Sequence, residues 1–184
     1  MFLFLSLLLS LVSVFPAQAS ESTGYIFVGD SRTVGVSQAV DKDENVFFVA
    51  EVGKGYDWFC ETALNEVDSI IDNNAKDNWV IVSSLGVNDL SNVEKYKLKY
   101  KELCEGNWKD YDFYIVSVTC IDESKYKGTV TNDAILEFNR QMRYYKNFID
   151  IFDISRQEIV TKDGLHYTSD VYAELYDEVM CCLE

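Results

Sequence analysis

The chain has 184 residues, of which 31 are acidic and 16 are basic, so its formal net charge is -15. Such a charge repels nucleic acid phosphates and anionic lipid surfaces, and we expect neither as a partner. The length suits one compact domain rather than two domains. We interpret the acidic excess as a source of solubility, with selection of a cationic ligand as the alternative.

Residues 1–19 contain no charged side chain and end in the small-x-small pattern Ala17-Gln18-Ala19. This pattern is typical of a secretory signal peptide that is cleaved after a small residue. A membrane anchor is the alternative, but the apolar run is interrupted by a proline and is shorter than the roughly 20 residues that span a bilayer. We therefore predict a signal peptide at 1–19, a single domain at 20–184, and a secreted protein without stable membrane insertion.

The sequence contains five cysteines, none in a C-x-x-C pair, and a single histidine. A zinc site needs a denser set of such ligands, so we expect no metal and no other cofactor. Export permits a disulfide, but an odd number leaves at least one thiol free or paired between chains. The pattern does not indicate which of them pair: Cys60, Cys104, Cys120, Cys181 and Cys182.

Short apolar runs rich in β-branched and aromatic residues alternate with segments of helical spacing. The runs predict strands at Tyr25–Val28, Val46–Val52, Trp79–Ser83, Phe113–Val118 and Phe148–Ile154. Helical stripes are formed by Phe59, Ala63, Val67 and Ile70, by Ile135, Met142 and Tyr145, and by Tyr172, Leu175, Tyr176 and Val179. Because parallel strands need crossover connections, this alternation predicts an α/β fold, a three-layer α/β/α sandwich around a parallel five-stranded sheet. Ligands bind outside the carboxyl ends of such strands, so functional residues should follow them.

The first predicted strand is followed by Gly29-Asp30-Ser31-Arg32, which places a serine at a strand-to-helix turn. A nucleophilic serine needs this position, because its hydroxyl and its amide N-H then face the ligand. A helix N-cap is the alternative for Ser31, since serine is a preferred cap. Arg32 has two interpretations: an ion pair with Asp30 or another acid, which we favour, or a contact with a substrate carboxylate.

The next two predicted strands are followed by residues that can donate hydrogen bonds. Gly53 and Gly55 follow the second strand, and glycine lets a backbone N-H approach a ligand closely. We favour Gly55 as the donor because it directly precedes a helical stripe, where free N-H groups are available, and Gly53 stays open. Asn88 follows the third strand, and its amide can donate to an oxyanion, although asparagine is also a common turn residue.

The histidine of the chain, His166, lies just before the last helical stripe, with Asp163 three residues before it. A turn of that length brings the carboxylate to one ring nitrogen, so that the other nitrogen can take a proton from serine. A lone histidine is otherwise most often a surface or structural residue. All four segments lie where the predicted sheet places functional groups, which favours one catalytic site at its edge.

In order and in residues, these segments resemble the four blocks of the SGNH hydrolases, also called the GDSL family. The matching blocks are Gly29-Asp30-Ser31, the pair Gly53/Gly55, Gly86-Val87-Asn88-Asp89 and Asp163-Gly164-Leu165-His166, with Arg32 where the fuller motif has leucine. The resemblance implies a flavodoxin-like sheet, with Ser31 as nucleophile, His166 as base and Asp163 as its orienter. It also implies an oxyanion hole made of the Ser31 N-H, the Gly55 N-H and the Asn88 side chain. The Gly-x-Ser-x-Gly elbow of the α/β-hydrolases does not match, because no second glycine follows.

The family resemblance implies a serine esterase. Short loops and the lack of an apolar insertion that would form a lipase lid lead us to expect small acyl groups, such as acetyl, on a carbohydrate or cell-wall glycan. Tyr56, Trp58 and Tyr167 flank the expected site and serve either to stack on a sugar ring or to pack the core. Two alternatives are acyl transfer to a sugar hydroxyl, with the same residues, and a non-catalytic glycan-binding module, which needs no base.

Overall fold

A computed structural model describes residues 22–145, 147–157 and 159–183. The predicted signal peptide at 1–19 lies outside the described residues, as does the start of the predicted domain. Among the described residues, no helix combines the length and the apolar character that crossing a membrane requires.

Five parallel strands form one sheet in the order β2-β1-β3-β4-β5. They are β1 (Thr23–Gly29), β2 (Val46–Ala50), β3 (Asn78–Ser84), β4 (Asp112–Val116) and β5 (Phe148–Ile149). This is the flavodoxin-like order, and the predicted fold class is confirmed. Gly29 pairs with Ala50 on one side and with Ser84 on the other, so the loops after β1, β2 and β3 start side by side at one edge.

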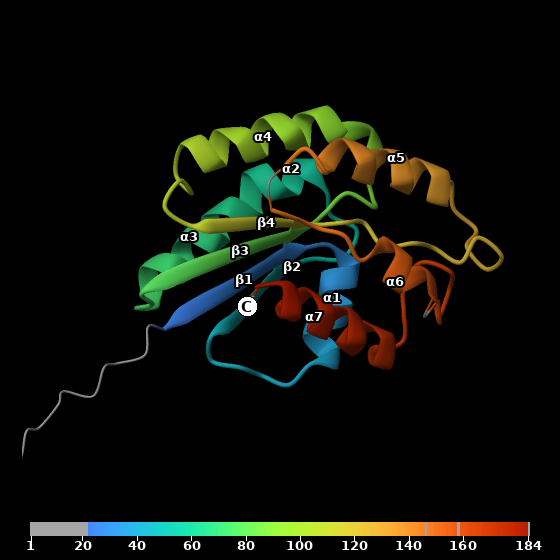
Figure 1. Cartoon of the computed structure of the whole chain (residues 1–184), viewed down its shortest axis with the longest axis horizontal. Helices are drawn as coiled ribbons and strands as arrows, with labels where there is room; N and C mark the ends of the chain where they lie inside the picture. Colours follow the sequence, from blue (N-terminus) through green and yellow to red (C-terminus); the bar gives the residue numbers. More distant parts are fainter. Residues whose placement is uncertain (1–21, 146, 158, 184) are drawn as a thin grey trace, which may run out of the picture.

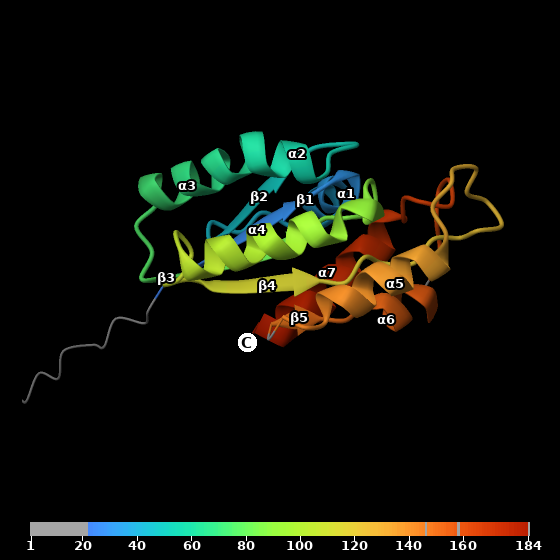
Figure 2. The same cartoon turned by 90° about the horizontal axis from the view of Figure 1, so that it is seen from above.

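Helices cover both faces of the sheet (Figure 1 and Figure 2). One face carries α2 (Tyr56–Trp58), a π-helical turn η1 (Phe59–Ala63), α3 (Leu64–Asn73), a 3-10 turn η2 (Leu90–Asn92), α4 (Val93–Glu105) and α5 (Asn132–Met142). The other face carries α1 (Ser31–Ala39) and α7 (Ser169–Leu183), while α6 (Phe152–Gln157) follows β5. The protein is therefore a three-layer sandwich.

Two hydrophobic cores result from the alternation of side chains along the strands. In β1, Ile26 and Val28 join the core under α3, α4 and α5, whereas Phe27 joins the core under α1 and α7. The first core is rich in aromatic residues, including Phe59, Tyr96, Tyr100, Trp108 and Phe138. Burial on both faces explains why the strands appear in the sequence as continuous apolar runs.

The predicted strands were too long at three carboxyl ends. β2 ends at Ala50 and β4 at Val116, two residues earlier than predicted in each case. The run Phe148–Ile154 was wrong beyond Ile149, because its second half belongs to α6. The Asp150 carboxylate accepts a hydrogen bond from the Phe152 N-H at 3.2 Å, which starts a helix where the apolar pattern continues.

Candidate active site

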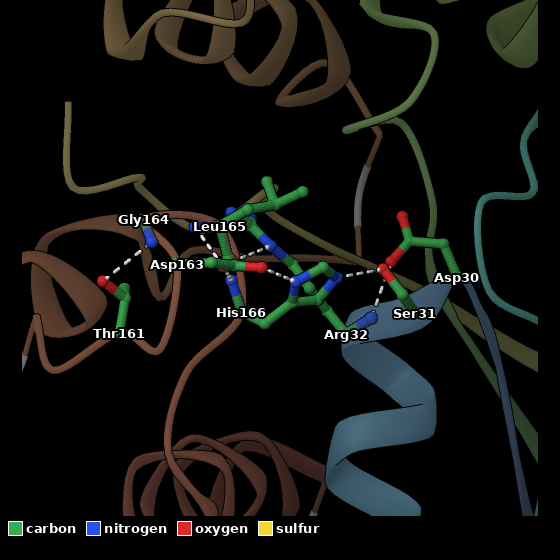
Figure 3. A network of polar contacts seen from close by, with 8 residues as sticks. All are labelled: Asp30, Ser31, Arg32, Thr161, Asp163, Gly164, Leu165 and His166. Atoms are coloured by element: carbon green, nitrogen blue, oxygen red, sulfur yellow. Dashed lines mark hydrogen bonds and ion pairs between the residues drawn. The ribbon is translucent and has the colours of Figure 1, made fainter. Parts of the chain in front are cut away.

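Ser31 is the first residue of α1, directly after the turn that ends β1. The N-cap of this helix is Asp30, whose carboxylate accepts a hydrogen bond from the Arg32 N-H at 2.9 Å. The alternative that Ser31 is the cap is therefore wrong. Its hydroxyl instead meets the base expected from the sequence, with 2.9 Å between Ser31 Oγ and His166 Nε2 (Figure 3).

The other side of the His166 ring contacts Asp163. Its Nδ1 lies 2.7 Å from Asp163 Oδ2, while Oδ1 of the same carboxylate accepts the N-H groups of Leu165 and His166 at 2.9 and 2.8 Å. A carboxylate at Nδ1 favours the tautomer that carries its proton there, which leaves Nε2 to accept a proton from Ser31. The spacing of three residues thus produces the geometry that it predicted.

Asp163 stays ionised over the whole neutral and mildly acidic range. Burial opposes its ionisation, but hydrogen bonds from the His166 N-H, the His166 ring and the Leu165 N-H outweigh this and lower the pKa of Asp163 to about 2. The Asp163 and His166 side chains are 54% and 33% exposed, so the site opens to solvent. An ionised carboxylate at this distance can stabilise a protonated His166 ring.

Asp30, the residue before Ser31, has the opposite environment. It is 1% exposed, and burial raises its pKa to about 6, although the Arg32 N-H and the Arg32 charge lower it. Its carboxylate accepts a hydrogen bond from the Arg32 N-H in the first turn of α1 and not from the imidazole. The two carboxyl groups near Ser31 therefore differ in their contacts, because Asp163 contacts the His166 ring and Asp30 caps the helix that begins at Ser31.

The two remaining oxyanion candidates lie on loops that hydrogen bonds hold together. Asn88 Nδ2 donates to the Lys54 carbonyl at 2.8 Å, and the Tyr56 N-H donates to Asp89 Oδ2 at 2.7 Å. These two bonds flank Gly55, which is the N-cap residue of α2. A Cβ on Gly55 would lie 2.5 Å from Asp89 Oδ2, so any larger residue at this position would have to displace the Asp89 carboxylate.

Gly53 differs from Gly55 in both conformation and surroundings. Its φ of +74° lies in the left-handed region that favours glycine, and a Cβ there would point into open space. Gly53 therefore serves the turn after β2, whereas Gly55 lies against the segment that carries Asn88. This arrangement favours Gly55 over Gly53, and its role as an oxyanion donor stays a prediction.

Asp89 had no assigned role in the sequence interpretation, although it directly follows Asn88. Besides the Tyr56 N-H, its carboxylate accepts hydrogen bonds from the Tyr96 hydroxyl and from Asn92 Nδ2, both at 3.0 Å. It thereby links the start of α2 to η2 and α4. The sequence signal that pointed to it was the last position of the Gly-x-Asn-Asp block.

The predicted ion pair between Arg32 and an acid was wrong. Within residues 22–145, 147–157 and 159–183, no carboxylate lies within ion-pair distance of this guanidinium, which is held by backbone carbonyls. The acceptors are the carbonyl oxygens of Thr119, Leu165 and Cys120, at 2.7, 3.2 and 3.2 Å. The side chain is 8% exposed, so its contacts are internal, as the favoured structural interpretation requires.

The three aromatic residues near the site divide into two groups. Tyr167 is fully buried and packs edge-on against Tyr172, so it belongs to the core and cannot stack on a sugar. Tyr56 is half-buried with its ring edge-on to Tyr96, and Trp58 is half-buried as well. A contact of Tyr56 or Trp58 with a sugar stays a prediction.

The five cysteines are free thiols in the structure. Cys120 is buried, Cys60 and Cys104 are half-buried, and Cys181 and Cys182 are exposed near the end of α7. The part of the chain that the structure describes holds no group of three or more histidine, cysteine, aspartate or glutamate side chains placed to bind a metal ion.

Comparison with known proteins gives matches at the level of structure. No protein-family model and no curated protein matches the chain. A member of the lipolytic protein G-D-S-L family from Veillonella parvula superposes with a TM-score of 0.61 at 18% identity, over 86% of this chain and 97% of that one. The chain shares the fold of this protein.

Two further solved structures have the same fold. The C-terminal catalytic domain of Streptococcus pneumoniae peptidoglycan O-acetyltransferase A superposes with a TM-score of 0.62 at 16% identity, covering 89% of this chain and 94% of that one. An acetyl xylan esterase superposes with a TM-score of 0.64 at 16% identity, covering 88% and 100%. The fold implied by the family resemblance is thus confirmed.

Proposed function

We propose that this chain is a serine esterase of the SGNH type, with Ser31 as nucleophile, His166 as general base and Asp163 as the residue that orients the base. The observation that carries the proposal is the chain of hydrogen bonds from Asp163 Oδ2 to His166 Nδ1 at 2.7 Å and from His166 Nε2 to Ser31 Oγ at 2.9 Å. A structural histidine needs neither bond in this orientation. The fold shared with a G-D-S-L lipolytic protein supports the same chemistry.

The first half of the reaction forms an acyl-enzyme. His166 Nε2 takes the Ser31 Oγ proton as Oγ attacks the ester carbonyl carbon, and negative charge develops on the carbonyl oxygen. The N-H groups of Ser31 and Gly55 and the Asn88 side chain are the donors proposed for this charge. His166 then gives its proton to the leaving alkoxide, the alcohol departs, and the acyl group stays on Ser31.

The second half releases the acyl group. His166 takes a proton from a water molecule, the hydroxide attacks the acyl carbon, and the proton returns to Ser31 Oγ as the carboxylic acid leaves. A sugar hydroxyl in place of the water would make the protein an acyltransferase. This second candidate is supported by the fold shared with a peptidoglycan O-acetyltransferase, and it uses the same three residues.

For the substrate, we propose small acyl groups, above all acetyl, carried by a carbohydrate or cell-wall glycan. Two proteins of the same fold are an acetyl xylan esterase and a peptidoglycan O-acetyltransferase, which supports this class. The half-buried Tyr56 and Trp58 supply aromatic surface suited to a sugar ring. Secretion, proposed from residues 1–19, would bring the enzyme to such substrates.

The proposed nucleophile is tested by labelling with a fluorophosphonate and by acetate release from acetylated xylan and acetylated peptidoglycan. We expect wild type to be labelled and to release acetate, and Ser31→Ala and His166→Ala to do neither. Ser37→Ala is the matched control, because Ser37 lies on the same helix with its hydroxyl bound to the Val34 carbonyl at 2.9 Å.

The alternatives give different outcomes in the same assay. Absence of labelling in the wild type would favour a non-catalytic glycan-binding module. Product formation that depends on an added sugar acceptor would identify a transferase, and activity confined to long-chain lipid esters would contradict the proposed substrate class.

A further inference from the structure

Arg32 joins the helix of the nucleophile to the loop of the base. It directly follows Ser31, and its Nε donates at 3.2 Å to the carbonyl oxygen of Leu165, the residue directly before His166. This bond connects the same two segments as the Ser31–His166 contact, one position away on each of them. In Figure 3 the Arg32 side chain runs behind the His166 ring on its way to Leu165.

The far end of the guanidinium is fixed to the loop that follows β4. Its Nη1 donates to the Thr119 carbonyl at 2.7 Å and to the Thr119 hydroxyl at 2.8 Å, and its Nη2 donates to the Cys120 carbonyl at 3.2 Å. The Tyr167 ring lies next to it, with 5.5 Å between Arg32 Cζ and the ring centroid. Because the donors of a guanidinium are fixed in one plane, these contacts together select a single orientation.

Burial alone does not favour an arginine at this position. The side chain is 8% exposed, and within the described residues no carboxylate lies within ion-pair distance of it. Burying a charge is unfavourable unless other groups compensate it, and here three backbone carbonyls and the Thr119 hydroxyl do so, while the Arg32 charge also lowers the pKa of the buried Asp30. What an apolar side chain cannot supply is the directed bond to Leu165.

We propose that Arg32 is a positioning residue that holds the His166 loop at reacting distance from Ser31, an inference that rests on the proposed function of these two residues. Arg32 lies in the first turn of α1, and its planar guanidinium bonds to both the loop after β4 and the His166 loop. Without these hydrogen bonds the His166 ring can move away from Ser31 Oγ. A displacement of about 1 Å can lower a rate by about 100-fold. Arg32 acts through His166 and not on the substrate, so substrate affinity stays nearly constant.

The experiment compares Arg32→Lys, Arg32→Leu and Arg32→Ala with wild type. Arg140→Ala is the control, because Arg140 is an exposed arginine paired with Glu137 on α5. We measure kcat and KM for an aryl acetate, with the melting temperature as the check of folding. We expect kcat to fall by about 10- to 100-fold in the Arg32 variants at nearly unchanged KM, and neither to change in Arg140→Ala.

Chemical rescue separates positioning from support of the fold. Methylguanidinium added to Arg32→Ala can occupy the vacated site and donate to the same carbonyls, so we expect it to restore part of kcat. Stabilisation of the fold alone would not raise kcat of a variant that is already folded. A folded Arg32→Leu or Arg32→Lys with wild-type kcat overturns the proposal, as does a kcat loss in folded Arg32→Ala without rescue.

Two milder substitutions decide the matter if Arg32→Ala does not fold. Arg32→Lys keeps the charge and the aliphatic stem, and Thr119→Val removes a single acceptor. Both should then lower kcat at unchanged KM, Thr119→Val by less, and a wild-type kcat in both overturns the proposal. Failure of the proposed function looks different, because the wild type itself would then neither react with a fluorophosphonate nor cleave the ester.

Discussion

Asp30 directly precedes Ser31 and Asp163 lies three residues before His166, yet these two carboxyl groups ionise in different pH ranges. Burial raises the pKa of Asp30 to about 6. At Asp163, burial is outweighed by hydrogen bonds from His166 and Leu165, which lower the pKa to about 2. Between these values Asp163 is charged while Asp30 still holds its proton, so the effects of the two groups can be separated by pH.

Asp30→Asn should change how stability depends on pH. The pKa of Asp30 is about 6 in the folded protein against 3.8 for a free side chain, so the unfolded chain loses this proton first. The contribution of Asp30 to the free energy of unfolding therefore declines as the pH rises from about 4 to about 6 and is constant above that range. The variant keeps an oxygen that can accept the Arg32 N-H but has no proton to lose. Urea unfolding of both proteins from pH 4 to 7 measures the difference, and parallel curves would contradict the prediction.

Asn88→Ala should lower kcat by about 100- to 1000-fold, the usual effect of removing one oxyanion donor. Its Nδ2 also donates to the Lys54 carbonyl, so the melting temperature is measured alongside to separate turnover from folding. Asn65→Ala is the control, since Asn65 is a helical asparagine with its side chain on the Glu61 carbonyl at 3.2 Å. Undiminished turnover in folded Asn88→Ala would remove Asn88 from the oxyanion hole.

At the scale of elements, the loop that presents Asp163 and His166 depends on a glycine. Gly164 has a φ of +92°, and a Cβ there would lie 2.2 Å from the backbone nitrogen of Tyr126. Gly53 has a φ of +74° but open space around the position of a Cβ. The two glycines therefore have the same backbone preference and differ in steric contact.

Gly164→Ala and Gly53→Ala form a matched pair of tests. Gly53→Ala should lower the free energy of unfolding by about 1 to 2 kcal/mol, the effect of a left-handed conformation alone. Gly164→Ala should lower it further and also reduce kcat, because the clash with Tyr126 displaces the His166 loop. Urea unfolding and kcat of both variants provide the comparison. Equal losses of stability, with kcat unaffected in both, would show that the contact with Tyr126 does not matter.

Element types were predictable from the sequence where burial patterns are simple, and not where they are mixed. Strands β1 and β3 are buried on both faces and appear as continuous apolar runs. Helix α4 was not predicted, because its buried residues Tyr96, Tyr100 and Leu103 are separated in the sequence by lysines and glutamates. At β5, the apolar pattern continues into α6, and only the hydrogen bond from the Phe152 N-H to the Asp150 carboxylate marks the change.

At the scale of the whole molecule, the candidate site is assembled from segments that are far apart in the chain, such as Ser31 and His166, which are separated by 135 positions. The sequence predicted this meeting because each segment follows a strand of one parallel sheet. The sequence could not predict the contacts of Arg32. Its main acceptors are backbone carbonyls, which every residue has, so no side-chain pattern identifies them. The same holds for the bond of Asn88 to the Lys54 carbonyl.

The net charge of -15 predicts that added salt stabilises the folded protein. Like charges repel more strongly in the compact state, and raising the ionic strength from about 0.01 M to about 0.1 M shortens the Debye length from about 30 Å to about 10 Å. The melting temperature should therefore rise over a sodium chloride series. Choline chloride should give the same shift if screening is the cause, and a fall in melting temperature would contradict it.

The direction of α7 has a practical consequence for handling the protein. The helix starts just after His166 and runs back along the sheet, so its end lies away from the carboxyl edge of the strands, as does the start of β1 (Figure 1). An anchor or fusion partner attached at either of these positions would leave the edge that carries Ser31 and His166 facing outward. The protein can thus be immobilised on a bead with the candidate site still open to solvent.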